Sequence, residues 1–211
     1  MTGITHHIPD NLLIAYSAGT LPKPFALVVA AHVSLCDECR ARLAAHEAAG
    51  GAIIEDSTPE QISESLRDRV LDALDAPFDL PTPQPRQGVY PGPVMEALKG
   101  HPPKWKRMGM GNRQCIIDHG PEGSVRLLWI PPGQAVPDHG HNGLELTLVL
   151  QGAFEDETGH FGPGDLEVAD ADLEHTPIAA DGPPCICLAA TDGALKFNAF
   201  MPRVLQPLFR I

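Results

Sequence analysis

The first part of the chain has apolar residues at helical spacing, which predicts a set of short helices up to about residue 76. Asp10 is the expected N-cap of the first helix, and Gly19 is its expected stop. Residues 25–33 are apolar almost throughout. A helix of that kind is expected to be buried on most sides or sandwiched between partners.

Two further helices are predicted before Pro77. One begins near Asp37 and is expected to stop at residues 50–51, which are both glycine. The other is expected to start at Ser57, because Glu60 three residues later completes a capping box. Its amphipathic stripe consists of Ile62, Leu66, Val70, Leu71 and Leu74. These apolar residues suit a core, but four short helices with few aromatic residues make a thin core, so part of this surface is equally suited to docking on a partner.

A proline-rich segment separates this helical part from the rest of the chain. Six of the seventeen residues from Pro77 to Pro93 are proline, which favours an extended, semi-rigid tether. Beyond Ala97 short β-rich runs alternate with Gly and Pro, which is typical of a β-sandwich or small barrel. These runs are residues 114–117, 125–130, 144–150, 165–169, 185–189 and 195–200. The predicted fold is multi-domain α + β, with an all-α domain over 1–76, a linker over 77–97 and an all-β domain over 98–211.

Charge and cysteine content narrow the classes of function. The 211 residues carry 27 acidic and 15 basic side chains, a formal net charge of −12. This disfavours direct nucleic-acid binding, which needs clustered Lys and Arg, and suits covering a basic protein surface instead. The five cysteines and ten histidines, with no export signal and no apolar run of roughly 20 residues, indicate metal or thiol chemistry in a reducing compartment. We expect a cytoplasmic protein with no membrane contact.

The first cluster of candidate metal ligands contains His32, Cys36 and Cys39, at spacings of four and three residues. A helix end followed by a helix start can direct all three at one point. Zinc favours four nitrogen or sulfur ligands, so a fourth must come from elsewhere, and His6 and His7 stand just ahead of the first helix. The alternative is a satisfied helix-end histidine beside two buried or redox-active cysteines.

The second cluster lies within residues 133–152, which match the pattern G-x5-H-x-H-x3-E-x6-G of the cupin family without a gap. Residues two apart on a strand share a face, so His139, His141 and Glu145 can all point into a barrel. His175 on a neighbouring strand is the natural fourth ligand. Three imidazoles and one carboxylate suit zinc, iron, manganese or nickel. The alternative is a metal-free barrel whose polar interior residues hydrogen-bond one another.

Further thiols and histidines lie outside these two clusters. Cys185 and Cys187 share one strand face, as either a reactive or metal-proximal pair or as buried structural cysteines. Cys115 lies in an apolar run and is expected in the core. His119 and His160 are expected on the surface.

The early histidine, the H-x3-C-x2-C junction over residues 32–39 and the downstream amphipathic helix resemble the zinc-binding anti-sigma factors. More closely, residues 32–42, residues 128–154 and the C-terminal end resemble the ChrR type, in which an anti-sigma domain precedes a cupin domain. The resemblance implies one zinc in each domain. The ligands it implies are His7, His32, Cys36 and Cys39 in the helical domain, and His139, His141, Glu145 and His175 in the cupin.

The resemblance also implies a function without catalytic residues. A four-helix domain would bind an extracytoplasmic-function (group IV, sigma-E-like) sigma factor in a 1:1 complex, and would release it under oxidative stress such as singlet oxygen. Exposed acidic residues would complement a basic sigma surface or form an ordinary solvated acidic face; the residues concerned are Asp37, Glu38, Glu64 and Asp68. Two alternatives remain, a metal-dependent cupin dioxygenase with an accessory zinc domain and a constitutive scaffold with no sensing role.

Overall fold

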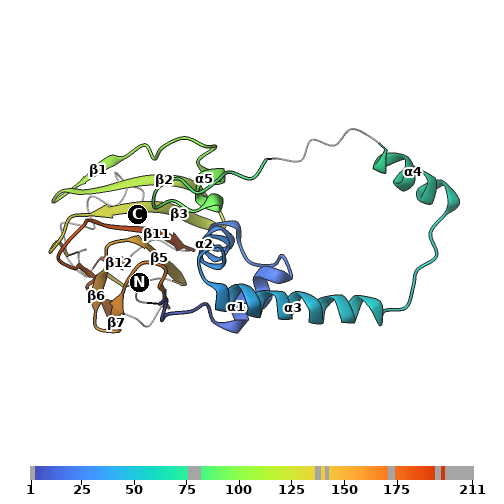
Figure 1. Ribbon diagram of the computed structural model, residues 1–211, viewed down its shortest axis with the longest axis horizontal. Coiled ribbons are helices and arrows are strands. Elements are labelled where there is room, and N and C mark those ends of the chain that lie inside the picture. Colours follow the sequence, from blue (N-terminus) through green and yellow to red (C-terminus); the bar gives the residue numbers. More distant parts are fainter. Residues whose placement is uncertain are drawn as a thin grey trace.

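Helices and a β-structure lie side by side in the protein, and one helix stands apart from both (Figure 1). The structure is a computed structural model. It describes residues 3–75, 82–135, 139–140, 143–170, 174–192 and 196–197, with the backbone alone at 139–140, 174 and 196–197. Among these residues, none of the helices combines the length and the apolar character needed to cross a membrane.

Five helices are present in the described residues: α1 (Asp10–Ser17), α2 (Lys23–Val33), α3 (Asp37–Glu55), α4 (Glu64–Leu74) and α5 (Gly92–Ala97). The expected N-cap of α1 is wrong by one residue. Pro9 occupies the cap position, and Asp10 is the first helical residue. Its carboxylate instead pairs with Arg42 at 2.6 Å and His46 at 3.2 Å, which ties α1 to α3.

The predicted stop of α3 at its paired glycines is also wrong. The helix continues through Gly50 and Gly51 to Glu55. Glycine weakens a helix by about 1 kcal/mol relative to alanine but does not forbid helical dihedral angles. A stop needs a competing cap, and that comes later, where the Ser57 hydroxyl donates to the Ile54 carbonyl at 2.7 Å.

Because Ser57 serves the end of α3, the capping box predicted there does not form. Helix α4 begins seven residues later at Glu64, and Ser63 is its N-cap. The Ser63 hydroxyl accepts a hydrogen bond from the Leu66 amide at 3.2 Å. All eleven residues of α4 are described and all are exposed.

The main sheet has six antiparallel strands in the order β1-β2-β3-β11-β5-β8. These strands are β1 (Lys106–Gly109), β2 (Asn112–Gly120), β3 (Gly123–Ile130), β5 (Glu145–Gln151), β8 (Leu166–Ala169) and β11 (Cys185–Thr191). Five of the six predicted β-runs fall in these strands. The sixth, residues 195–200, is described only at β12 (Lys196–Phe197).

Two smaller three-stranded sheets complete the β-part. One has the order β10-β6-β7 and consists of β10 (Ile178–Ala179), β6 (Phe154–Asp156) and β7 (Gly159–Phe161). The other has the order β12-β4-β9, with β4 (His139–Gly140) between β12 and β9 (Glu174–His175). The all-β architecture expected after residue 98 is confirmed.

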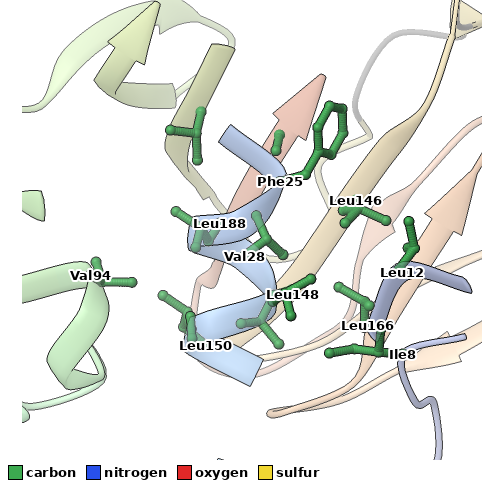
Figure 2. Packing of buried hydrophobic residues seen from close by; sticks show 14 of the residues in the cluster. Ile8, Leu12, Phe25, Val28, Val94, Leu146, Leu148, Leu150, Leu166 and Leu188 are labelled. Atoms are coloured by element: carbon green, nitrogen blue, oxygen red, sulfur yellow. The ribbon is translucent and has the colours of Figure 1, made fainter. Parts of the chain in front are cut away.

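The two faces of the main sheet contribute side chains to two different hydrophobic clusters. On one face Leu146, Leu148 and Leu188 join the helices in a single hydrophobic core, and Figure 2 shows them beside Val28 and Phe25 of α2. On the other face, alternate residues of the same strands form a second cluster with Phe154 and Phe161. The expectation that residues 25–33 form a helix covered on most sides is confirmed, because Lys23 is the only exposed residue of α2.

The predicted extended tether is wrong over residues 92–97. There the chain forms α5, with Pro91 at its N-cap and Pro93 in its first turn, positions at which proline is tolerated. Val94 and Met95 of α5 are fully buried, and α5 packs against α2. Two apolar side chains therefore decide the local structure in spite of the proline content. The boundaries proposed for the domains stay a prediction, although helices and sheet share one core.

Candidate metal centres

The first cluster of candidate ligands comes together from three places in the helical part. His7 precedes α1, His32 lies in the last turn of α2, and Cys36 and Cys39 lie at the start of α3. The His7 Nδ1 atom is 3.4 Å from the Cys36 sulfur and 3.7 Å from the Cys39 sulfur. The rings of His7 and His32 are perpendicular, with centroids 6.4 Å apart. One ligand atom from each of the four residues lies within 4.8 Å of the others.

His32 shows that this cluster suits a metal ion. Its side chain is fully buried, and neither ring nitrogen makes a hydrogen bond within the described residues. A buried polar atom without a partner costs about 1–3 kcal/mol, a cost that a bound metal ion removes. Burial, followed by the nearby His7, lowers the pKa of His32 to about 4, so the ring is in the neutral form that binds metals. The unpaired ring nitrogens favour a metal ligand over a satisfied helix-end histidine.

The two thiols are buried and free of disulfides. Burial raises the pKa of the Cys39 thiol, which keeps its proton when no cation is near. The Cys36 sulfur accepts a hydrogen bond from the Cys39 amide at 3.4 Å, and the N-terminal end of α3 favours negative charge at this position. A metal ion and the helix end together supply the positive charge that two thiolates need.

His7 also contacts a carboxylate, that of Glu38. The Nε2 atom of His7 is 3.3 Å from the Glu38 carboxylate, while its Nδ1 atom faces the sulfurs. Carboxylates at this position orient metal-binding imidazoles. His6, the other N-terminal candidate, lies elsewhere, with its ring centroid 4.4 Å from that of Phe161. The structure thus brings His7 to the thiols, as the family resemblance implied.

The second predicted set is only partly visible. His141 and the side chain of His139 lie outside the described residues. The backbone of β4 places His139 directly opposite His175 of β9. Glu145 is buried at the start of β5, and its carboxylate accepts a hydrogen bond from the Thr147 hydroxyl at 2.9 Å. Two of the four residues are therefore in register, and the complete ligand set stays a prediction.

Two acidic residues that sequence reasoning missed contact His175. Its Nδ1 atom is 2.7 Å from Asp156 of β6 and 3.1 Å from Glu167 of β8. Two ligands on one tetrahedral metal at about 2.1 Å would lie about 3.4 Å apart, so these shorter distances indicate hydrogen bonds. The Nδ1 atom of His175 is therefore engaged by both carboxylates. The sequence does contain a signal for this contact, because Glu167 is a carboxylate between the apolar residues Leu166 and Val168 of β8.

Charge in this buried group is shared among its three members. Burial raises the pKa of Glu167 to about 7. Burial also opposes charge on His175 and Asp156, but their hydrogen bonds outweigh it. The carboxylates raise the pKa of His175 to about 9, and the pKa of Asp156 is held below its ordinary value. At neutral pH the anionic Asp156 carboxylate therefore lies beside a protonated His175 ring.

The remaining thiols and histidines fall where they were expected. Cys185 and Cys187 are buried on the face of β11 that packs into the hydrophobic cluster with Phe154 and Phe161. A hydrogen bond with Cys185 and burial raise the pKa of Cys187, which favours the thiol over the reactive thiolate. Cys115 belongs to the core, and His119 and His160 are exposed.

Comparisons with known proteins cover nearly the whole chain. Residues 97–194 match the family described as the ChrR cupin-like domain. The chain is 54% identical over 211 residues to the anti-sigma-E factor ChrR of Cereibacter sphaeroides, covering 99% of both proteins. Its structure is similar to the crystal structure of Rhodobacter sphaeroides SigE in complex with the anti-sigma ChrR, with a TM-score of 0.79 and 52% identity, covering 90% of this chain and 99% of that chain.

Proposed function

The chain belongs to the family of the anti-sigma factor ChrR, and from this premise we propose that it sequesters an extracytoplasmic-function sigma factor of group IV in a 1:1 cytoplasmic complex. The observation that carries the proposal is the identity of 54% to an anti-sigma factor over the full chain. A protein of this family is a regulator of transcription rather than an enzyme. Bound sigma factor would be withheld from RNA polymerase until a signal arrives.

The exposed helix α4 supports this proposal. Its apolar residues lie four residues apart, and Leu66, Val70 and Leu74 are all exposed. An isolated helix of eleven residues is marginal in water, because its nucleation is costly. An amphipathic helix of this kind gains stability by laying its apolar side into a groove of another protein. We assign that role to the sigma factor, since the described part of the chain does not cover α4.

Charge makes a smaller contribution than the sequence indicated. Asp37 pairs with Arg40, and Asp68 lies 3.7 Å from Arg67. Glu38 lies beside His7. Three of the four acidic residues chosen for a basic sigma surface therefore have a basic or imidazole neighbour in this chain. Their effect on a partner is expected mainly on the association rate.

We assign zinc to both metal centres. In the first, two thiolates and two imidazoles suit a closed tetrahedral zinc site, which would join the N-terminal segment to α2 and α3. In the second, His139, His141, Glu145 and His175 would hold the metal inside the barrel, where it would supply the chemistry that senses an oxidant such as singlet oxygen. A change at this centre would release the sigma factor.

The test combines metal content with sigma binding in the full chain. Cys36→Ser should remove one zinc and abolish the complex, because the ends of α2 and α3 lose their link. Cys115→Ser is the matched control, since it replaces another buried thiol that is not one of the four candidate ligands and should keep both metals. A stable complex after complete loss of the first zinc would contradict a structural role for that site.

The second centre requires a different readout. Glu145→Ala and His141→Ala should lose the other zinc, keep sigma binding and lose the release of sigma by singlet oxygen. Induction by singlet oxygen at the wild-type level in these variants would show that the barrel metal is not the sensor. If oxidant leaves the affinity of the wild-type complex unchanged, the protein is a constitutive scaffold.

A further inference from the structure

One buried carboxylate of the β-part holds the N-terminal segment of the helical part. Asp165, just before β8, is 6% exposed. Its Oδ1 atom accepts hydrogen bonds from the backbone amides of Thr5 at 2.7 Å and His6 at 2.9 Å. Its Oδ2 atom accepts from the Gly162 amide at 2.9 Å, within its own turn. The same carboxylate therefore shapes its own hairpin and binds a segment 160 residues away.

Neighbouring contacts fix the same segment on both sides of Asp165. The Leu166 amide donates to the His6 carbonyl at 3.2 Å, so the segment lies along the beginning of β8. Ile4 packs over Gly164, where an added Cβ atom would lie 2.6 Å from its side chain. The φ of Gly164 is +95°, so glycine is required there for conformation and for space. The His6 ring lies against Phe161.

The next residue along the chain is His7, whose ring faces both thiols. With residues 4–6 held on the β-part, the backbone of His7 has little freedom, and its Nδ1 atom lies 3.4 Å from the Cys36 sulfur. We propose that Asp165 is a positioning residue for the metal centre of the helical part. This inference rests on the metal centre assigned above to His7, His32, Cys36 and Cys39.

The physical basis is preorganisation. An unrestrained segment ahead of α1 would lose the conformational entropy of several residues each time His7 reached the metal. The hydrogen bonds to Asp165 order these residues when the chain folds, so metal binding does not have to order them. They involve an ionised acceptor, and such bonds are stronger than neutral ones. Burial opposes the charge, but the amides of His6, Thr5 and Gly162 keep the pKa of Asp165 below its ordinary value.

The test uses the full chain loaded with cobalt(II), because only the site with thiolate ligands gives a sulfur-to-cobalt charge-transfer band. The rate at which a chelator removes this band reports the first centre alone. Asp165→Ala should release its cobalt about tenfold faster than the wild type, because His7 loses the backbone contacts that position it. Asp165→Asn should be intermediate, since one amide oxygen still accepts. Asp181→Ala, an exposed carboxylate of the β-part, is the control and should release at the wild-type rate.

A wild-type release rate in folded Asp165→Ala would overturn the inference. If that variant loses its β-structure by circular dichroism, Thr5→Pro decides instead. It removes the 2.7 Å donor and leaves the bond from Gly162 to Asp165 in place. Faster release supports the inference, and an unchanged rate overturns it. Absence of the charge-transfer band in the wild type would instead overturn the metal centre of the proposed function, and this inference with it.

Discussion

Helices α2 and α4 each have eleven residues, yet one is almost completely covered and the other completely exposed. Helix α2 is apolar on all sides, and the sheet, α5 and the two neighbouring helices surround it. Helix α4 has one apolar stripe among charged residues. A helix that is apolar all round has to be buried on most sides, whereas a helix with a single apolar stripe can keep that stripe exposed until a partner covers it. Helix α2 therefore holds the fold, whereas α4 carries the stripe that we assign to sigma binding.

The largest expected effect comes from a charge inside α2. Val28 is fully buried between the helices and the main sheet. Val28→Asp should cost more than about 4 kcal/mol, because it places a carboxylate without a partner in the core. Urea unfolding followed by circular dichroism measures this loss. Lys23→Ala, at the exposed residue of the same helix, should change the unfolding free energy by less than about 0.5 kcal/mol. Equal effects would contradict the burial of α2.

The same change in α4 should act on binding and leave folding intact. Leu66→Asp combined with Val70→Asp should weaken sigma binding by at least about 2 kcal/mol, roughly thirtyfold in Kd, because both residues belong to the apolar stripe. The melting temperature should stay within about 2 °C of the wild type. Calorimetric titration against the sigma factor gives the affinity. Asp72→Ala, on the opposite side of the helix, serves as the control. Wild-type affinity in the double variant would exclude α4 as the docking surface.

A weaker intervention removes the cap of α4 and leaves its apolar stripe. Ser63→Ala deletes the hydroxyl that accepts from the Leu66 amide and should destabilise the helix by about 1 kcal/mol. Since the complex needs the helical form, sigma affinity should fall about fivefold. Ser57→Ala, which affects the end of α3 instead, should have a smaller effect on affinity. A larger loss of affinity in Ser57→Ala than in Ser63→Ala would indicate that Ser57 is the N-cap of α4.

The smallest expected effect is a gain. Gly50→Ala and Gly51→Ala should each stabilise α3 by about 0.5–1 kcal/mol, because an added Cβ meets nothing within 4 Å at either position. Amide hydrogen exchange along α3 measures this local change. Gly123→Ala is the contrasting control: its φ is +118°, and a Cβ there would lie 2.3 Å from the Thr191 carbonyl oxygen, so it should destabilise the fold. A loss of protection in Gly50→Ala would indicate that the helix breaks there in solution.

Helix ends show where local reasoning failed. The pattern of Ser57 and Glu60 satisfies the rule for a capping box, but the Ser57 hydroxyl is already used by the carbonyl of Ile54. Gly50 and Gly51 are weak helix formers, yet the helix passes through them. In both places several local structures differ by about 1 kcal/mol, a margin that neighbouring turns can reverse.

The sequence by itself determined the helical and β-rich parts, most strand positions, the apolar stripe of α4 and the close approach of His32, Cys36 and Cys39. These features depend on residue spacing within one or two turns or strands. Only the tertiary structure decided that α2 lies on the sheet, that α4 stays uncovered, and that Asp156 and Glu167 meet at His175. It also brought Asp165 to residues 5–6. Such contacts join distant segments, and their geometry depends on how strands and helices pack, which no local pattern encodes.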